Sequence, residues 1–144
     1  MLVERYLVRR DARAQVAAGA DVLGINVEIP APSRGFVDES GLMLQAVAMV
    51  QEHTDAPICL DSCAPEVLEA GLRTYVGRAL VNSFSLEIGR AEIILPLVAR
   101  YGAAVIGLTI DEHGIPDTAE RRLNVAHRLV EVAESYGIPV AMFL

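Results

Sequence analysis

The sequence contains no lysine and no tryptophan, and all 12 of its basic residues are arginines. Without lysine the chain can form neither a Schiff base nor a Walker-type phosphate loop, because both need the lysine amine. Cysteine is scarce as well, since Cys59 and Cys63 are the only two. With no second cysteine pair or histidine cluster beside them, they predict neither a zinc site nor a disulfide framework, and we expect two reduced thiols.

Other missing features narrow the class of protein. A net charge of −7 argues against a nucleic-acid surface, which needs clustered positive charge. No apolar run approaches the roughly 20 residues of a membrane-spanning helix, and no secretory signal is visible. We therefore expect a cytoplasmic protein with no nucleic-acid or membrane partner. With 144 residues, 53% of them apolar, residues 1–144 are predicted to form a single domain.

Short apolar runs alternate with stretches of helical periodicity along the chain. The predicted strands span residues 20–27, 57–61, 78–82 and 103–110, with a fifth beginning at 138. The predicted helices span residues 3–18, 38–53, 65–72, 85–101 and 117–136. This alternation indicates repeated βαβ units and a parallel sheet. The turn-rich segment 29–35 is predicted to be a mobile loop.

The two faces of the predicted strands differ, and the difference favours a barrel. One face carries small residues or cysteine before a polar end, namely Gly24, Cys59 and Gly107, and we expect it to line the interior. The other face is valine, leucine and isoleucine, whereas a doubly wound sheet would need two comparably apolar faces. A complete barrel needs eight units and about 250 residues. The expected fold class is therefore α/β, a partial TIM (β/α)8 barrel with about five parallel strands alternating with helices.

Polar side chains follow the predicted strands, at the end where parallel α/β proteins bind ligands. This mouth holds Asn26, Glu28, Asp61, Ser62, Asn82, Ser83, Thr109 and Asp111. A hydrolytic triad is poorly supported because no histidine base is present, and the acids are too few and too separated to favour a metal. Asp61 with Asn82 suits a flat heterocycle carrying N–H donors and a carbonyl, because a carboxylate accepts and a carboxamide does both.

Helix capping is the alternative interpretation of the same residues. Asp61-Ser62 and Asn82-Ser83 each precede a predicted helix, and aspartate, asparagine and serine are preferred N-caps. Asp117, with Glu120 three residues later, resembles a capping box for the last helix. Local pattern alone does not choose between capping and ligand binding at Asp61 and Asn82.

Four segments carry a family resemblance: 15–21 (QVAAGAD), 57–62 (PICLDS), 81–83 (VNS) and 107–116 (GLTIDEHGIP). Together they resemble the pterin-binding barrel family, which includes the dihydropteroate synthases. The chain is most similar to the methyltetrahydrofolate:corrinoid/iron–sulfur protein methyltransferases and the folate module of corrinoid-dependent methionine synthase. The resemblance implies that Asp61, Asn82 and Asn26 hydrogen-bond the pterin. Ser62, Ser83, Thr109 and Asp111 are further mouth residues, and no catalytic residue or metal ligand is assigned.

The same resemblance implies a reaction and a partner. A methyl group would move from methyltetrahydrofolate, the substrate, to the cobalt of a corrinoid on a separate protein. Gly24 stands where the family's Asp-Val-Asn motif has its aspartate, and Glu28 replaces a small residue. Residues that the family places beyond the position of Leu144 also contact the pterin. We therefore expect a fragment with little independent methyltransferase activity.

Two other functions stay open. Dihydropteroate synthesis would need a Gly-Gly-Glu-Ser type of loop, which residues 27–32 (VEIPAP) do not supply. A non-catalytic half-barrel remnant or pterin-binding scaffold is the other. Because a partial barrel leaves edge strands unpaired near residues 22–27 and 138–144, we also expect a homo-oligomer.

Overall fold

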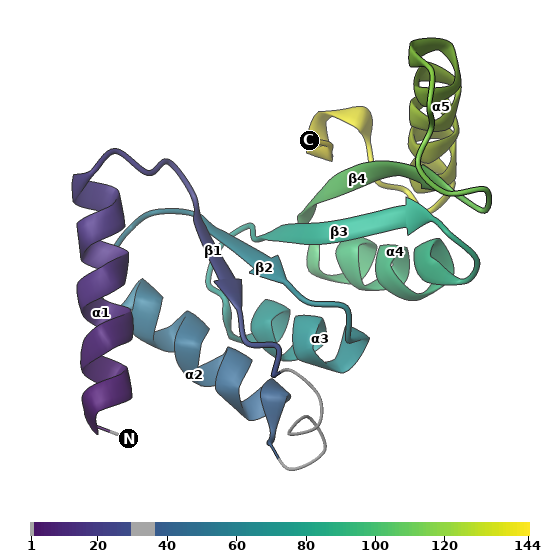
Figure 1. Ribbon diagram of the computed structural model, residues 1–144. Coiled ribbons are helices and arrows are strands. Elements are labelled where there is room, and N and C mark those ends of the chain that lie inside the picture. Colours follow the sequence, from purple (N-terminus) through teal and green to yellow (C-terminus); the bar gives the residue numbers. More distant parts are fainter. Residues whose placement is uncertain (1, 30–36) are drawn as a thin grey trace. The chain divides into compact units, whose positions relative to one another are not determined.

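The computed structural model describes residues 2–29 and 37–144, with side chains from residue 7 onward. Along these residues four strands alternate with five α-helices, and a short 3-10 helix follows (Figure 1). The chain divides into two compact units, residues 1–80 and 81–144. The predicted mobile loop 29–35 lies, from residue 30 on, outside the described residues.

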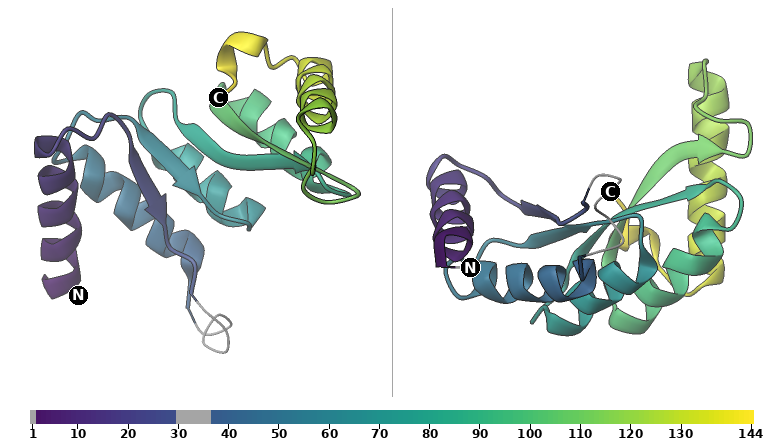
Figure 2. Two further views of the ribbon diagram at one scale, coloured as in Figure 1. Left: turned by 45° about the horizontal axis from the view of Figure 1, so that its top comes forward. Right: turned by 60° about the horizontal axis from the view of Figure 1, so that its bottom comes forward.

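The first unit combines two strands with three helices. Its elements are α1 (Leu2–Ala17), β1 (Leu23–Asn26), α2 (Glu39–Gln51), β2 (Ile58–Asp61) and α3 (Pro65–Thr74). β1 and β2 pair in parallel, and the register makes Asn26 the partner of Asp61. Helices α2 and α3 pack together on one face of this strand pair (Figure 2).

Side chains of β1 alternate between the helix layer and solvent. Leu23 and Ile25 are buried, whereas Gly24 and Asn26 are exposed. A strand with one covered face requires this period of two. The predicted apolar and polar faces of the first strand are therefore confirmed.

The core of the first unit depends on a close approach of α3 to β2. A Cβ atom placed on Gly71 would lie 2.9 Å from Leu60 Cδ2 and 3.1 Å from Met43 Cγ. Leu60 and Met43 are fully buried, so neither has free space beside it. Glycine at position 71 thus lets the helix backbone come down onto the strand.

The second unit also combines two strands with helices. Its elements are β3 (Leu80–Leu86), which begins at the boundary, then α4 (Arg90–Tyr101), β4 (Ala104–Asp111), α5 (Ala119–Ser135) and the 3-10 helix η2 (Val140–Met142). β3 and β4 are neighbours in the sheet, and α5 packs against β4. The largest fully buried side chains of this unit are Val81, Phe84, Ile94, Leu95, Val98, Val105 and Val125.

β3 is longer than the sequence predicts. The strand was expected to end at Asn82 and a helix to begin near Ser85, but β3 continues to Leu86 and α4 begins at Arg90. Phe84 explains the difference, because its fully buried ring packs edge-on against Phe143 with the ring centroids 5.8 Å apart. This long-range contact favours strand over the local helical pattern.

The face of β4 that carries Val105 and Gly107 is covered and not open to water. Val105 is fully buried. A Cβ atom on Gly107 would lie 3.4 Å from the Phe143 ring and 3.6 Å from Leu129 Cδ1 of α5. These are ordinary van der Waals distances, so this face of β4 is packed against Phe143 and Leu129.

Residues 138–144 do not form the predicted fifth strand. Met142 N–H donates to Pro139 O at 2.8 Å and Phe143 N–H to Val140 O at 3.0 Å, which closes the 3-10 helix. The segment then reaches β4 in one parallel bridge between Phe143 and Val105. Proline at 139 has no N–H group for a strand ladder, which favours the turn.

Helix starts agree with the sequence in one case and differ in another. Asp38, where the predicted helix 38–53 begins, is the N-cap of α2, and its carboxylate accepts a hydrogen bond from Gly41 N–H at 2.9 Å. The cap of α5 is Thr118, whose hydroxyl accepts from Arg121 N–H at 3.2 Å, so the predicted Asp117 capping box is wrong by one residue. Either side chain can cap, and the backbone path after Pro116 decides which one does.

Gly71→Ala is expected to destabilise the protein, although alanine in a helix is normally better than glycine by roughly 0.5–1 kcal/mol. The added methyl group would press on Leu60 and Met43, and overpacking of this kind costs about 1–3 kcal/mol. The measurement is the midpoint of urea unfolding. Glu66→Ala, at an exposed position of the same helix, serves as the control and should change stability by less than about 0.5 kcal/mol. A raised midpoint for Gly71→Ala would show that α3 has spare room.

Candidate functional site

Asn26 and Asp61 lie side by side at the ends of β1 and β2. They are direct partners in the parallel register, Asn26 being exposed and Asp61 half-buried. Among the described residues, no group forms a hydrogen bond or ion pair with the Asp61 carboxylate. A carboxylate at a strand end without a protein partner is a strong acceptor available to a ligand.

The Asn26 carboxamide is oriented by the backbone of Glu28. Its Oδ1 atom accepts a hydrogen bond from Glu28 N–H at 2.8 Å. An amide NH2 group cannot accept this bond, so the contact assigns the oxygen to the inner position. The NH2 group of Asn26 is therefore the end that can donate to a ligand, next to the acceptor Asp61.

The turn after β2 is held by two further hydrogen bonds. Glu28 Oε1 accepts from Cys63 N–H at 2.9 Å, which joins the turn to the end of β1. Ser62 is 2% exposed and its hydroxyl accepts from Ala64 N–H at 3.1 Å. Ser62, predicted as a mouth residue, thus shapes the turn that follows Asp61.

Helix capping does not explain Asp61 or Asn82. The N-cap of α3 is Ala64 and the N-cap of α4 is Gly89, neither with a side-chain cap bond. Asn82 and Ser83 lie inside β3. The capping interpretation of Asp61 and Asn82 is wrong, because Ala64 and Gly89 occupy the N-cap positions of α3 and α4.

Asn82 and Ser83 are half-buried in the second unit. No hydrogen bond from the described residues reaches the Asn82 side chain, and the backbone oxygen of Ser83 accepts from Arg90 Nη2 at 3.2 Å. Asp61 and Asn82 belong to different units. Their joint contact with one ligand stays a prediction.

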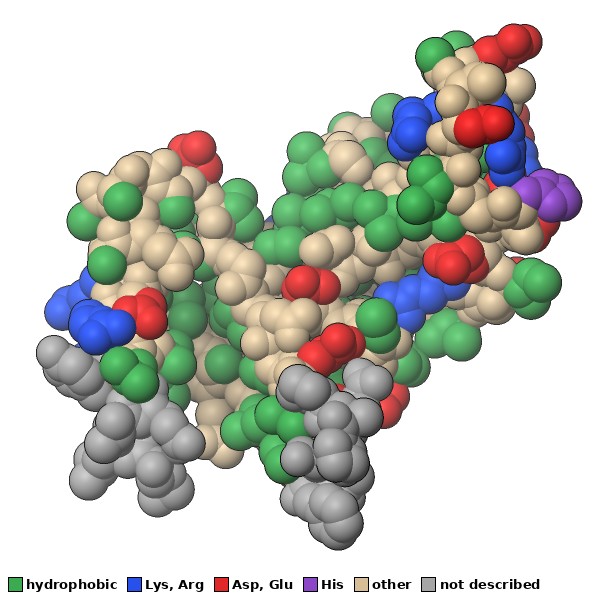
Figure 3. Space-filling view, viewed as in Figure 1, with side chains coloured by type: hydrophobic (Ala, Val, Ile, Leu, Met, Phe, Trp, Pro, Cys, Tyr) green, Lys and Arg blue, Asp and Glu red, His purple; other side chains and the backbone are tan. Residues whose placement is uncertain are grey.

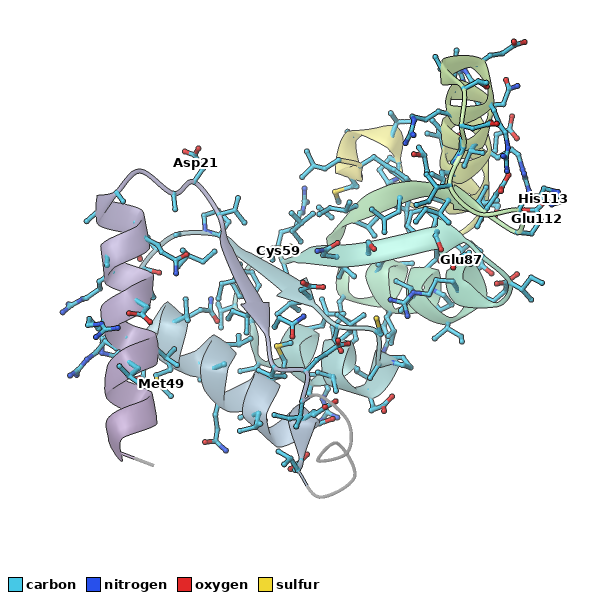
Figure 4. All side chains as sticks on the ribbon, viewed as in Figure 1. Asp21, Met49, Cys59, Glu87, Glu112 and His113 are labelled. Atoms are coloured by element: carbon cyan, nitrogen blue, oxygen red, sulfur yellow. The ribbon has the colours of Figure 1, made fainter. Side chains whose placement is uncertain are left out.

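Cys59, labelled on β2 in Figure 4, has an unreactive thiol. Burial raises the pKa of its thiol, and the negative charge of Asp61 raises that pKa further. The protonated thiol is neither a nucleophile nor a metal ligand at neutral pH. Cys59 therefore acts as a small core residue.

Asp111, at the end of β4, is bound by the helix that follows. Its carboxylate is 4% exposed; it accepts from Arg121 Nη2 at 3.1 Å and from His113 N–H at 2.9 Å. Arg128 lies 3.6 Å from the second oxygen and forms an ion pair with Glu112 at 3.1 Å. Burial raises the pKa of Asp111, but the His113 N–H and the Arg121 charge outweigh it, and the pKa stays below its ordinary value.

Thr109 is engaged in the same way. Its hydroxyl accepts from Arg122 Nη1 at 3.1 Å, and Arg122 Nη2 donates to Pro116 O at 3.0 Å. Both predicted mouth residues of β4, Thr109 and Asp111, are thus held by α5 through side-chain contacts.

Sequence reasoning missed the three arginines of α5 that make these contacts, Arg121, Arg122 and Arg128. The available signal was their position on one predicted helix directly after an Asp-Glu-His turn. Figure 3 shows blue side chains along α5 beside acidic groups, and Figure 4 labels Glu112 and His113 at the turn after β4. The arginines stabilise that turn.

The first unit contains a cavity of about 510 Å³. It lies between the starts of α2 and α3 and is lined by Asp38, Glu39, Ser40, Cys63 and Glu66, among others.

In the described ranges, no three histidine, cysteine, aspartate or glutamate residues lie close enough to hold a metal ion. Nor is any helix of that part of the chain long and apolar enough to cross a membrane.

Residues 7–141 match the protein family described as pterin binding enzyme. The chain therefore belongs to this family, as the motifs around Asp61 and Asn82 predict.

Particular relatives come from two groups of proteins. The chain is 33% identical over 153 aligned residues to methionine synthases of Mycobacterium leprae (strain TN) and Mycobacterium tuberculosis (strain ATCC 25618 / H37Rv). Each alignment covers all of this chain and 12% of the relative.

Two solved dihydropteroate synthases share the fold. The enzyme from Vibrio fischeri ES114 matches with a TM-score of 0.76 and 16% identity, over 99% of this chain and 54% of that one. The enzyme from Thermus thermophilus, in complex with 6HMPPP, matches with a TM-score of 0.65 and 26% identity, over 94% and 51%. These neighbours are TIM barrels, and the chain spans about half of them, which confirms the predicted partial barrel.

Acidification is expected to destabilise the second unit at the turn after β4. The pKa of Asp111 is lower in the folded protein than in the unfolded chain, so folding favours the ionised form. Its contribution is complete above the ordinary value of about 3.9 and is lost as the pH falls through the lower folded value. The free energy of unfolding should therefore fall below about pH 4.

Asp111→Asn should be less stable at neutral pH and should show a flatter acid limb. The measurement is urea unfolding from about pH 6 to about pH 3. Asp55→Asn, at an exposed position, is the matched control and should keep the slope of the parent. Parallel curves for the parent and Asp111→Asn would contradict the assignment.

Proposed function

We propose that this chain binds the pterin ring of methyltetrahydrofolate in a protein that transfers the methyl group to a corrinoid. Membership of the pterin-binding family and 33% identity to two methionine synthases support the substrate class. The observation that carries the proposal is the Asp61 carboxylate, which ends β2 and has no partner among the described residues.

The donor and acceptor pattern suits a pterin. Asp61 can accept hydrogen bonds from adjacent ring N–H and exocyclic amino groups, while the NH2 group of Asn26 donates to a neighbouring acceptor of the ring. A pterin contact of Asn82, which lies in the second unit, stays a prediction from the sequence. These groups bind and orient the ring, and no residue of the chain is assigned a catalytic step.

The methyl group would leave a tertiary ring amine for the cobalt of a reduced corrinoid on a partner protein. The nitrogen must be protonated or strongly hydrogen-bonded before it can leave. The chain spans 12% of the methionine synthases that it matches, so the methyl acceptor and the partner protein belong to the proposal. A protein that binds the pterin and leaves a corrinoid's cobalt spectrum unchanged would be a scaffold.

Asp61→Asn is expected to weaken methyltetrahydrofolate binding by about 1.5–3 kcal/mol, the range for a hydrogen bond to a charged group. The substitution keeps the size of the side chain and removes the charge and one acceptor. Isothermal titration calorimetry measures the change in affinity. Asp21→Asn, an exposed aspartate before β1, is the matched control and should bind like the parent. Equal affinity in the parent and Asp61→Asn would refute the role of Asp61.

We also propose that the chain self-associates. Figure 3 shows hydrophobic side chains gathered over the second unit, where Leu108, Val140 and Leu144 are 39%, 53% and 75% exposed. Exposed apolar surface of this kind is covered by association, at roughly 25 cal/mol per Å2 buried.

We expect light scattering of the protein at a concentration of order 10⁻⁵ M to give a mass well above the 15.5 kDa of one chain. Leu108→Ser, which replaces an exposed apolar side chain of β4 with a polar one, should lower the measured mass. A monomer in the parent would contradict self-association.

A further inference from the structure

Glu28 touches both strand ends of the candidate site. Its backbone N–H donates to Asn26 Oδ1 at 2.8 Å, and its carboxylate Oε1 accepts from Cys63 N–H at 2.9 Å. Cys63 lies two residues after Asp61 along the chain. One residue therefore joins the end of β1, which carries Asn26, to the turn that leaves Asp61.

The two contacts have different chemistry. The bond to Asn26 comes from the backbone, so it forms with any residue other than proline at position 28. The bond to Cys63 needs the side chain, and a carboxylate that accepts from a backbone N–H forms a bond roughly twice as strong as a neutral one. The side chain at position 28 thus decides how firmly the turn after β2 is tied to β1.

We propose that Glu28 is a positioning residue for the ligand bound at Asn26 and Asp61. The inference rests on the proposed pterin site. By holding Cys63, Glu28 sets the path of the chain directly after Asp61 and keeps the Asp61 acceptor beside the Asn26 donor. A heterocycle with adjacent donor and acceptor groups needs both at a fixed separation, and holding them there before binding removes an ordering cost.

A positioning role and direct contact with the ligand predict different responses to glutamine. Glu28→Gln keeps an acceptor oxygen for Cys63 N–H and loses the charge, whereas Glu28→Ala removes the acceptor. If Glu28 positions the turn, glutamine retains most of the affinity. If its charge binds the ligand, glutamine loses as much as alanine.

Binding of methyltetrahydrofolate is measured by calorimetry for the parent, Glu28→Gln, Glu28→Ala and the control Glu131→Ala, at an exposed position of α5. We expect Glu28→Ala to bind about tenfold more weakly, the factor for one charge-assisted hydrogen bond. Glu28→Gln should stay within about threefold of the parent, and Glu131→Ala should equal it. Equal losses in Glu28→Gln and Glu28→Ala, or no loss in either, would overturn the positioning role.

The tie itself is measured without ligand by nuclear magnetic resonance. In the parent, the Cys63 amide proton should shift as the pH is lowered from about 7 to about 3, the range in which carboxyl groups titrate. This titration should vanish in Glu28→Gln and Glu28→Ala, while their other amide signals show that both fold. A Cys63 amide that does not titrate in the parent would overturn the tie. Parent protein that titrates at Cys63 and binds no pterin would refute the proposed function alone.

Discussion

The parallel pairing of β1 with β2 is the constraint on which the candidate site depends. Its register makes Asn26 and Asp61 partners, so a donor and an acceptor from distant parts of the sequence become neighbours. The pairing is supported from one side by α2 and α3, and α3 lies close to β2 because residue 71 is glycine. Leu60, on β2 at this contact, is fully buried. Packing on the apolar face of the strands thus fixes the polar ends.

Hydrogen bonds of Glu28 then hold the polar groups at the ends of β1 and β2. Glu28 N–H orients the Asn26 carboxamide, and the Glu28 carboxylate binds the turn after Asp61. The Asp61 carboxylate, in contrast, has no such partner within the described ranges. Side chains that are satisfied by the protein hold the geometry, and a side chain that is not satisfied is left for a ligand. Family membership supports our proposal that this ligand is a pterin.

The second unit uses charge where the first uses hydrogen bonds to backbone. Asp111 is buried at a strand end and balanced by Arg121 and Arg128, two arginines of the helix that follows. A buried carboxylate without such partners would be costly, so the ion pairs and the turn require each other. Thr109 and Asp111 share the strand-end location of Asp61, but α5 already occupies their side chains.

Local pattern in the sequence was sufficient for the alternation of strands and helices, the buried face of β1 and the motifs around Asp61 and Asn82. Periodicity and strand-end polarity are properties of neighbouring residues, and they predict an α/β partial barrel and a pterin site. Long-range contacts decided the rest. β3 extends beyond its predicted end because Phe84 packs against Phe143. The Gly107 face of β4 is packed against Leu129 and Phe143. Residues 138–144 form a 3-10 helix and one bridge where a strand was expected. In the sequence, Glu28 is visible only as a departure from a family motif. The fold brings the Cys63 N–H group to the Glu28 carboxylate, and a hydrogen bond between residues 35 positions apart leaves no local pattern in the sequence.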